Sequence, residues 1–263
     1  MKTIVCALAF AGAALLATGA NAADVYTPVA PEVQQVTTES GWTFTIAPYF
    51  WAAGLSGDMD QFGLPPVHVD ASFSDIFDHL DFGAMAISEA RYDRYSFFND
   101  LSYVKISGSA ATPRGIVAGS VDVSSETFMT MLGAGYAVLD GPSGRLEIAG
   151  GARIWSVDTE ISFSGGVLDG VSQSDGATWV DGLVGVRGTY QITPEFYLTG
   201  WGFVGAGAAD IDWDVAGVLG YRFNERFSAV AGYRALGVDY SNDDGFAFDV
   251  VQQGPIIGLV VQF

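Results

Sequence analysis

The side chains most able to do chemistry in this sequence are arginines and carboxylates at alternating positions of apolar segments. Five arginines and five carboxylates share this placement: Glu89, Arg91, Asp100, Glu147, Arg153, Asp181, Arg187, Asp214, Arg222 and Arg234. An unpaired buried charge costs about 3 to 5 kcal/mol, so we expect these groups to pair with one another. Such a network would either plug an enclosed space with salt bridges or line a narrow, selective path. The equal numbers of positive and negative charges favour the plug.

Alternating residues are held on opposite faces by β-strands. The chain carries a net charge of −19, yet only 16% of its residues are charged, 49% are hydrophobic and its mean hydropathy is +0.30. Apolar residues that are abundant but spread over alternating positions are typical of a transmembrane β-barrel. The strong negative charge argues against nucleic acid as a partner.

The N-terminus predicts export. Lys2 precedes an apolar run from Ile4 to Leu16, and the small residues Ala20 and Ala22 suit cleavage by a signal peptidase. We interpret residues 1–22 as a signal peptide, 23–41 as a flexible periplasmic tail and 42–263 as the barrel. The one cysteine lies within the signal peptide, and we expect no disulfide, metal or cofactor.

Segments with a period of two residues recur ten times. They cover 42–57, 82–93, 95–107, 120–139, 145–162, 178–192, 195–207, 212–223, 226–240 and 246–263. Short links alternate with mostly longer ones, as periplasmic turns and outer loops do, which predicts an all-β, antiparallel up-and-down barrel of ten strands. The link at 208–211 is short for an outer loop, so eight or twelve strands remain open.

The face on which each side chain falls supports this prediction. In the segment 212–223, Trp213, Leu219 and Tyr221 fall on one face. Asp212, Asp214 and Arg222 fall on the other. An arginine facing mid-membrane lipid would cost about 2 to 4 kcal/mol, so the charged face is expected inside the barrel. At eight to ten strands the interior is narrow enough for side chains to close it. Arg145 is placed instead at a short periplasmic turn.

The first outer link carries both histidines, His68 and His79. Within it, DASFSDIFDHLDF has apolar residues at helical spacing, with Ser74 as a plausible N-cap and Asp75 in the first turn. We predict a short amphipathic helix over the barrel mouth or on the membrane interface. Omptin-type proteases and lipid A deacylases use rim histidines with acids or a serine, but neither constellation is matched, and we expect no enzymatic activity.

Acidic residues crowd the predicted outer end of the barrel. They are Asp58, Asp60, Asp70, Asp75, Asp78, Asp158, Glu160, Asp169, Asp175, Asp239, Asp243 and Asp244. They either hold divalent cations that bridge to lipopolysaccharide phosphates or are simply solvated loop carboxylates; the second interpretation is favoured.

With these residues placed, the chain resembles the small outer-membrane β-barrel proteins of diderm bacteria, the group that includes the OmpA membrane domain and the porin family. The resemblance implies a location in the outer membrane of a diderm bacterium. The likeness rests on APYFWAAGLSGD, GARIW, WVDGLVGVRG, AGYRALGVDY and the closing GPIIGLVVQF. In that group a final strand ending in Phe resembles the signal bound by the barrel assembly machinery, and Ile257, Leu259, Val261 and Phe263 fit the pattern.

The sequence thus predicts a structural or interfacial protein in contact with outer-membrane lipid and lipopolysaccharide. A narrow channel for small solutes, with a preference for cations, is the alternative, and a rim hydrolase is a distant third. The oligomeric state is left open.

Overall fold

The computed structural model describes residues 41–63, 65–112 and 118–263. The predicted signal peptide and the predicted tail up to residue 40 lie outside this part of the chain, so both stay predictions.

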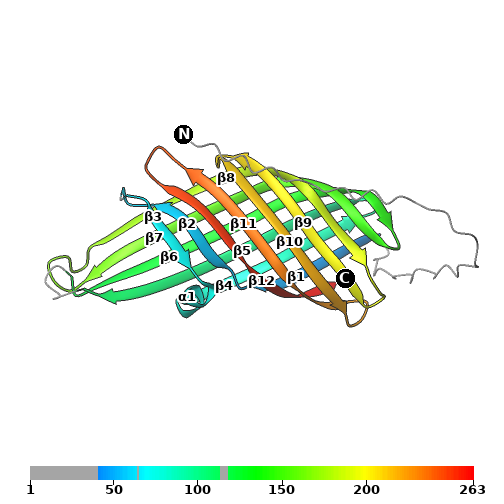
Figure 1. Cartoon of the computed structure of the whole chain (residues 1–263), viewed down its shortest axis with the longest axis horizontal. Helices are drawn as coiled ribbons and strands as arrows, with labels where there is room; N and C mark the ends of the chain where they lie inside the picture. Colours follow the sequence, from blue (N-terminus) through cyan, green and yellow to red (C-terminus); the bar gives the residue numbers. More distant parts are fainter. Residues whose placement is uncertain (1–40, 64, 113–117) are drawn as a thin grey trace, which may run out of the picture. The chain divides into compact units, whose positions relative to one another are not determined.

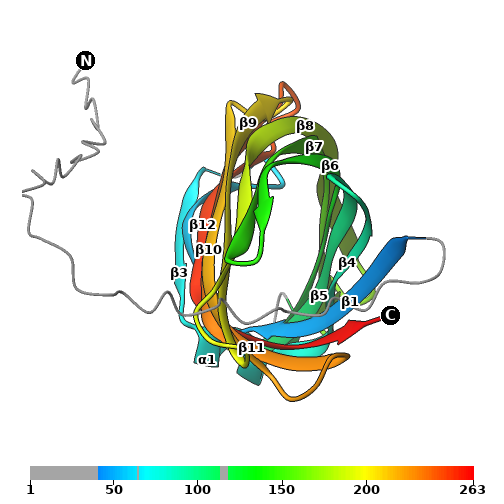
Figure 2. The same ribbon diagram turned by 90° about the vertical axis from the view of Figure 1, so that its right-hand side faces the viewer.

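Ten strands close into an antiparallel barrel, in which each strand pairs with the next (Figures 1 and 2). They are β1 (Trp42–Trp51), β4 (Leu80–Tyr92), β5 (Tyr95–Ala111), β6 (Ser120–Gly141), β7 (Gly144–Ser164), β8 (Ser172–Gln191), β9 (Phe196–Gly207), β10 (Ile211–Arg222), β11 (Phe227–Ser241) and β12 (Ala247–Gln262). The prediction of a ten-stranded barrel is confirmed. The link between β9 and β10 is a tight hairpin, in which Gly207 N donates to Ala209 O at 3.1 Å.

The barrel closes between its first and last strands. β1 pairs with β12 from Thr45↔Gln262 to Trp51↔Ile256. The backbones of Phe44 and Phe263 exchange two hydrogen bonds, of 2.8 and 3.2 Å. Closure satisfies the backbone groups of both strands, which is the condition for a sheet within lipid.

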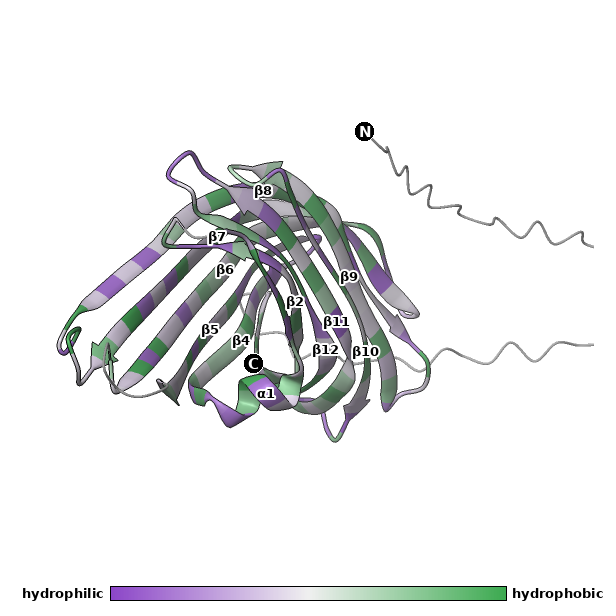
Figure 3. Cartoon of the chain, turned by 60° about the vertical axis from the view of Figure 1, so that its left-hand side comes forward, coloured by the Kyte–Doolittle hydropathy of each residue, from purple (hydrophilic) through white to green (hydrophobic). Residues whose placement is uncertain are grey.

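Alternation along the strands separates an apolar outer face from a polar inner face, and bands of opposite hydropathy alternate along them in Figure 3. Val215 and Leu219 on β10 are both 46% exposed, whereas Asp214, which directly precedes Val215 and points to the opposite face, is 1% exposed. Val184 on β8 is 66% exposed, and Asp181 is fully buried. The charged face of these strands therefore points into the barrel, as predicted.

The first outer link holds more structure than the sequence indicated. The predicted first strand, 42–57, is divided: β1 ends at Trp51, and β2 (Gly54–Asp60) forms a hairpin with β3 (Val67–Ala71), which is followed by α1 (Phe73–Asp78). β2 extends the barrel wall beyond β1 by pairing with β12 from Gly54↔Gln253 to Asp60↔Ala247. Within the described residues, no helix is long and apolar enough to span a membrane.

The predicted helix exists, but its start was placed two residues too late. Its N-cap is Ser72 rather than Ser74: the Ser72 hydroxyl accepts from Asp75 N at 3.3 Å, and the Asp75 carboxylate accepts from Ser72 N at 2.9 Å. This reciprocal pair is a capping box, which satisfies two free N–H groups at once and so selects Ser72. These hydrogen bonds also hold the pKa of Asp75 below its usual value.

Candidate functional site

The middle of the lumen is closed by a layer of buried charges. Arg234 donates to Asp214 at 2.7 Å and to Asp100 at 2.6 Å through Nη2. Arg153 binds Asp214 Oδ2 at 2.8 Å through Nη2 and Asp212 through Nη1. Both guanidinium groups and Asp212 are completely shielded from solvent. The layer joins β5, β7, β10 and β11 across the lumen.

Neutral donors complete the coordination of these carboxylates. The Trp201 indole donates to Asp214 Oδ1 at 3.0 Å, and the Trp155 indole donates to Asp212 Oδ2 at 3.1 Å. Tyr49 donates its hydroxyl proton to Asp100 at 2.8 Å and accepts from Arg234 at 2.9 Å. A buried charge is tolerated when it is both paired and hydrogen-bonded, and this layer meets both conditions.

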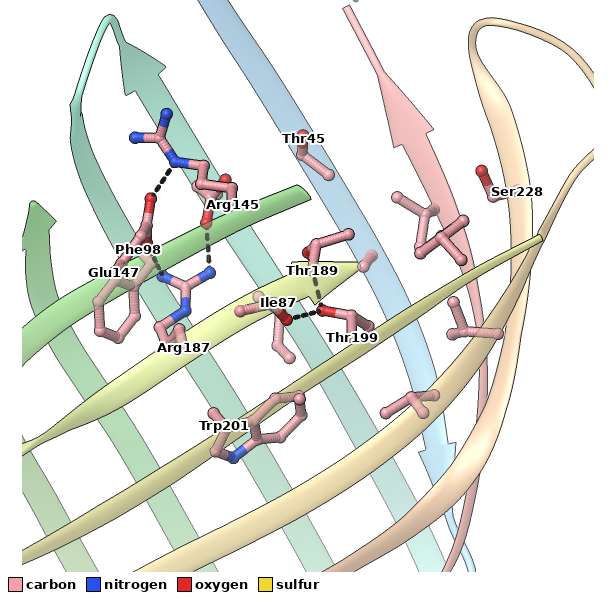
Figure 4. A pocket seen from close by; sticks show the side chains of 18 of the residues that line it. Thr45, Ile87, Phe98, Arg145, Glu147, Arg187, Thr189, Thr199, Trp201 and Ser228 are labelled. Carbon is pink, nitrogen blue, oxygen red and sulfur yellow. Dashed lines mark hydrogen bonds and ion pairs between the residues drawn. The ribbon is translucent and has the colours of Figure 1, made fainter. Parts of the chain in front are cut away.

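A second charged cluster lies nearer the short turns. Glu89 accepts hydrogen bonds from Arg91, at 2.5 Å, and from Arg187. The Arg187 guanidinium also lies over the Phe98 ring, 4.2 Å from its centre. Glu147 accepts from Arg145 Nε at 2.6 Å, and its second oxygen is 3.9 Å from Arg187 (Figure 4). The cluster joins β4, β7 and β8.

Two of the ten predicted residues do not join the network through ion pairs. Asp181 is the cross-strand neighbour of Arg153, but Arg153 is directed toward β10, and Asp181 instead accepts from Ala209 N at 2.8 Å. Arg222 donates to Pro194 O at 2.9 Å and lies over the Tyr197 ring. Among the described residues, neither takes part in a salt bridge, so the expected pairing was wrong for these two.

The prediction also left out two charged members. Asp212 pairs with Arg153, and Arg145, which was assigned to a turn facing the periplasm, pairs with Glu147 and with Asp140 at 2.6 Å. Their position in the alternation was sufficient to find them. Asp212 shares its face with Asp214, and Arg145 shares its face with Glu147 and Arg153.

An aromatic layer closes the lumen on the outer side of the charges. Trp179 stacks on Tyr240 with 4.1 Å between ring centres and 2° between planes, and on Trp155 at 5.7 Å and 13°. Phe246 and Phe248 pack against Trp179, and all five side chains are buried. Trp155 belongs to both layers through its hydrogen bond to Asp212, so the charged and aromatic layers form one continuous plug.

The half of the lumen nearer the short turns is hollow. A cavity of about 550 Å³ extends from the charged layer at Asp100 and Asp214 to the turn at 140–144 and to Gln262 near the C-terminus. Polar side chains such as Thr45, Thr189 and Thr199 line it together with the Arg187 cluster. The cavity thus ends at the plug.

The histidines occupy ordinary structural positions at the outer end. His68 and Asp58 are cross-strand partners in the β2–β3 hairpin, and their side chains, 2.8 Å apart, are 69% and 61% exposed. His79 Nδ1 lies 2.8 Å from the backbone oxygen of Asp75 at the end of α1.

Two acidic residues at the outer end bind backbone N–H groups of loops. Asp175 accepts from Phe62 N at 2.5 Å, and Asp169 accepts from Gly165 N at 2.7 Å. Within the described ranges, no three potential ligands gather as a metal site would require.

The predicted assembly signal lies on the outer face of the last strand. Ile257, Leu259 and Phe263 are 57%, 58% and 50% exposed, and Val261 shares their face. The structure thus places all four side chains where lipid or another protein can reach them.

No protein-family model and no curated protein matches the sequence. Among solved structures, the outer membrane protease OmpT of Escherichia coli matches with a TM-score of 0.50 and 10% identity, over 88% of this chain and 100% of that one. The translocator domain of the autotransporter NalP of Neisseria meningitidis (TM-score 0.46, 14% identity, 84% of this chain and 88% of that one) also matches, as does Ail of Yersinia pestis (0.36, 11%, 85% and 99%). The match to OmpT shows that the chain has the fold of bacterial outer-membrane β-barrels, and salt bridges are buried inside it.

Proposed function

We propose that the protein is an integral outer-membrane barrel with a structural or interfacial role, whose lumen passes little solute. The observation that carries this proposal is the complete burial of Arg153 and Arg234 within ion pairs that cross the lumen. Solute could pass only if these pairs separated, and breaking a buried pair costs about 3 to 5 kcal/mol. The aromatic stack of Trp155, Trp179 and Tyr240 adds a second barrier on the outer side.

A solute-uptake assay tests this proposal. Liposomes that contain the purified protein are placed in an isotonic solution of a small sugar or amino acid, and swelling is followed by light scattering. We expect swelling no faster than in protein-free liposomes. Rapid swelling in small solutes that is lost above a sharp solute size would favour the alternative function, a narrow channel.

One observation favours that alternative. The cavity of about 550 Å³ already opens half of the lumen, so a solute would have to cross only the plug. Four arginines and five carboxylates line the cavity, and this near balance gives little support for the predicted cation preference. They are Arg91, Arg145, Arg187, Arg222, Glu89, Asp100, Asp140, Glu147 and Asp214.

The cellular setting is part of the same proposal. A protein of this fold with an exposed final Phe263 would be exported through a cleaved signal peptide and inserted by the barrel assembly machinery as a relative of the OmpA membrane domain and the porin family. The acidic outer loops would then face the lipopolysaccharide layer. We propose no nucleic-acid partner, and the proposal does not depend on an oligomeric state.

We further propose that the protein is not an enzyme. The His68–Asp58 pair is explained by cross-strand pairing, and His79 by the end of α1. Incubation with a peptide library and with lipid A should leave both intact. Cleavage that is lost in His68→Ala or His79→Ala would overturn this part of the proposal.

A further inference from the structure

The barrel wall is interrupted along part of its outer half. The ladder between β1 and β4 runs from Trp42↔Tyr92 to Pro48↔Ala86 and ends there. Pro48 has no N–H to donate, which suits the end of a ladder. Beyond this point β1 pairs with β12, and within the described residues no ladder joins β3 to β4. The outer end of β4, from Leu80 to Met85, is therefore paired only with β5.

α1 lies at this gap in the wall (Figures 1 and 3). Phe73 of the helix packs edge-on against Phe50 at 5.7 Å and lies 5.5 Å from Phe77. Phe50 follows Phe44 and Ile46 on the outward face of β1, and it is 41% exposed. Phe77 is 52% exposed. The outer lipid-facing surface thus continues onto the helix.

Behind the helix, an apolar pocket of about 170 Å³ passes through the gap. Phe50, Phe73 and Phe77 line its outer side, and Met85, Met129 and Trp155 line its inner side. Trp155 is also part of the plug, so the pocket connects the outer surface to the aromatic layer without reaching through it.

We infer that this pocket binds one acyl chain of a membrane lipid, which enters sideways through the gap between β1 and β4. The pocket is lined mainly by apolar side chains. Its opening lies on the same outward surface that faces lipid, so the acyl chains of the membrane are in contact with the opening. An unpaired strand edge is costly in pure hydrocarbon. The open edge of β4 therefore belongs at the interface, where the ester end of the lipid can meet its backbone groups. This inference rests on the membrane location proposed above.

Photolabelling in vesicles tests the inference. The full-length mature protein is reconstituted in phosphatidylethanolamine and phosphatidylglycerol vesicles with a trace of phosphatidylethanolamine that carries a diazirine in its acyl chain. After illumination, labelled peptides are identified by mass spectrometry. We expect labels on inward-facing Met129 and Trp155 as well as on outward-facing Ile257 and Leu259. Labels confined to outward-facing residues would overturn the inference, and the absence of labels on Ile257 and Leu259 would instead contradict the membrane location.

A matched pair of glycine variants sharpens the test. Gly83 lines the pocket, and an added Cβ there would meet nothing closer than 3.8 Å, so Gly83→Phe should fill the pocket. Gly217 lies on the outward face of β10 with no atom within 4 Å of an added Cβ, so Gly217→Phe adds the same ring elsewhere. We expect Gly83→Phe to reduce labelling of Met129 and Trp155 at least fivefold and Gly217→Phe to leave it unchanged. Equal labelling of Met129 and Trp155 in both variants would overturn the inference. If a variant does not fold, the labelling pattern of the unmodified protein is the test.

Discussion

Arg234 on β11 and Asp214 on β10 are joined by two hydrogen bonds, 3.1 Å from Nε to Oδ1 and 2.7 Å from Nη2 to Oδ2. Bidentate pairing of this kind fixes the orientation of both groups. Arg234 also reaches Asp100 on β5, across the lumen. The pair therefore links neighbouring strands and holds opposite walls together, and it is the centre of the plug.

Removal of Arg234 should destabilise the barrel strongly. Arg234→Met takes away the main partner of Asp100 and one of the two arginines that pair with Asp214, which leaves buried negative charge uncompensated. We expect the free energy of unfolding to fall by about 3 to 5 kcal/mol, measured by urea titration in lipid vesicles. Arg226→Met is the control, because Arg226 lies exposed at a turn, and it should change stability by about 0.5 kcal/mol or less. Similar losses in the two variants would contradict the proposed network.

Replacement of both members of a pair should be less harmful than replacement of one. Arg153→Met leaves Asp212 buried with only the Trp155 indole as a side-chain donor. Arg153→Met combined with Asp212→Leu removes the stranded charge, so the double variant is expected to unfold at higher urea than the single variant. Additive losses in a double-mutant cycle would show that the two groups do not interact.

The Trp179–Tyr240 stack should contribute measurably to stability. Tyr240→Ala leaves a void beside a ring 4.1 Å away, and we expect a loss of about 3 to 5 kcal/mol in the free energy of unfolding. Tyr190→Ala removes the same atoms from a side chain that is 59% exposed on the outer face, so its loss should be smaller. A larger loss for Tyr190→Ala than for Tyr240→Ala would contradict the claim that the aromatic side chains inside the lumen stabilise the fold.

The final residue should matter for assembly apart from its backbone contacts. Phe263→Ser removes the ring but keeps the two hydrogen bonds to Phe44 that close the barrel. We expect its level in the outer-membrane fraction to fall several-fold, while the purified variant still folds into detergent. Normal membrane levels would show that the terminal ring is not an assembly signal.

The sequence was most informative where one physical rule applied along the whole chain. Alternation located all ten strands and oriented Asp214 and Arg187 inward, because a charge on the lipid face is costly wherever it occurs. The same rule, applied without exception, would also have found Asp212 and Arg145. Asp212 was placed on the inner face but was left out of the expected network, and Arg145 was left out because the end of its strand was treated as a turn.

The pairings across the lumen could not be predicted. Arg153 and Asp212 are 59 residues apart and belong to β7 and β10, and they meet only because of the tilt of the strands and the direction of each side chain. Asp181 is closer to Arg153 by strand register, yet it binds a backbone N–H instead. The β2–β3 hairpin was missed because GDMDQFGLPPVHVD lacks regular alternation, and its turn uses positive φ angles at Phe62 and Gly63.

Conductance of the native protein in a planar lipid bilayer tests the central claim, a closed lumen, most directly. Recordings at moderate voltage and in symmetrical salt should show no stable current steps after insertion has been verified by protease protection. Discrete, reproducible steps would contradict the claim, and a cation-selective reversal potential in a salt gradient would establish the channel in its place.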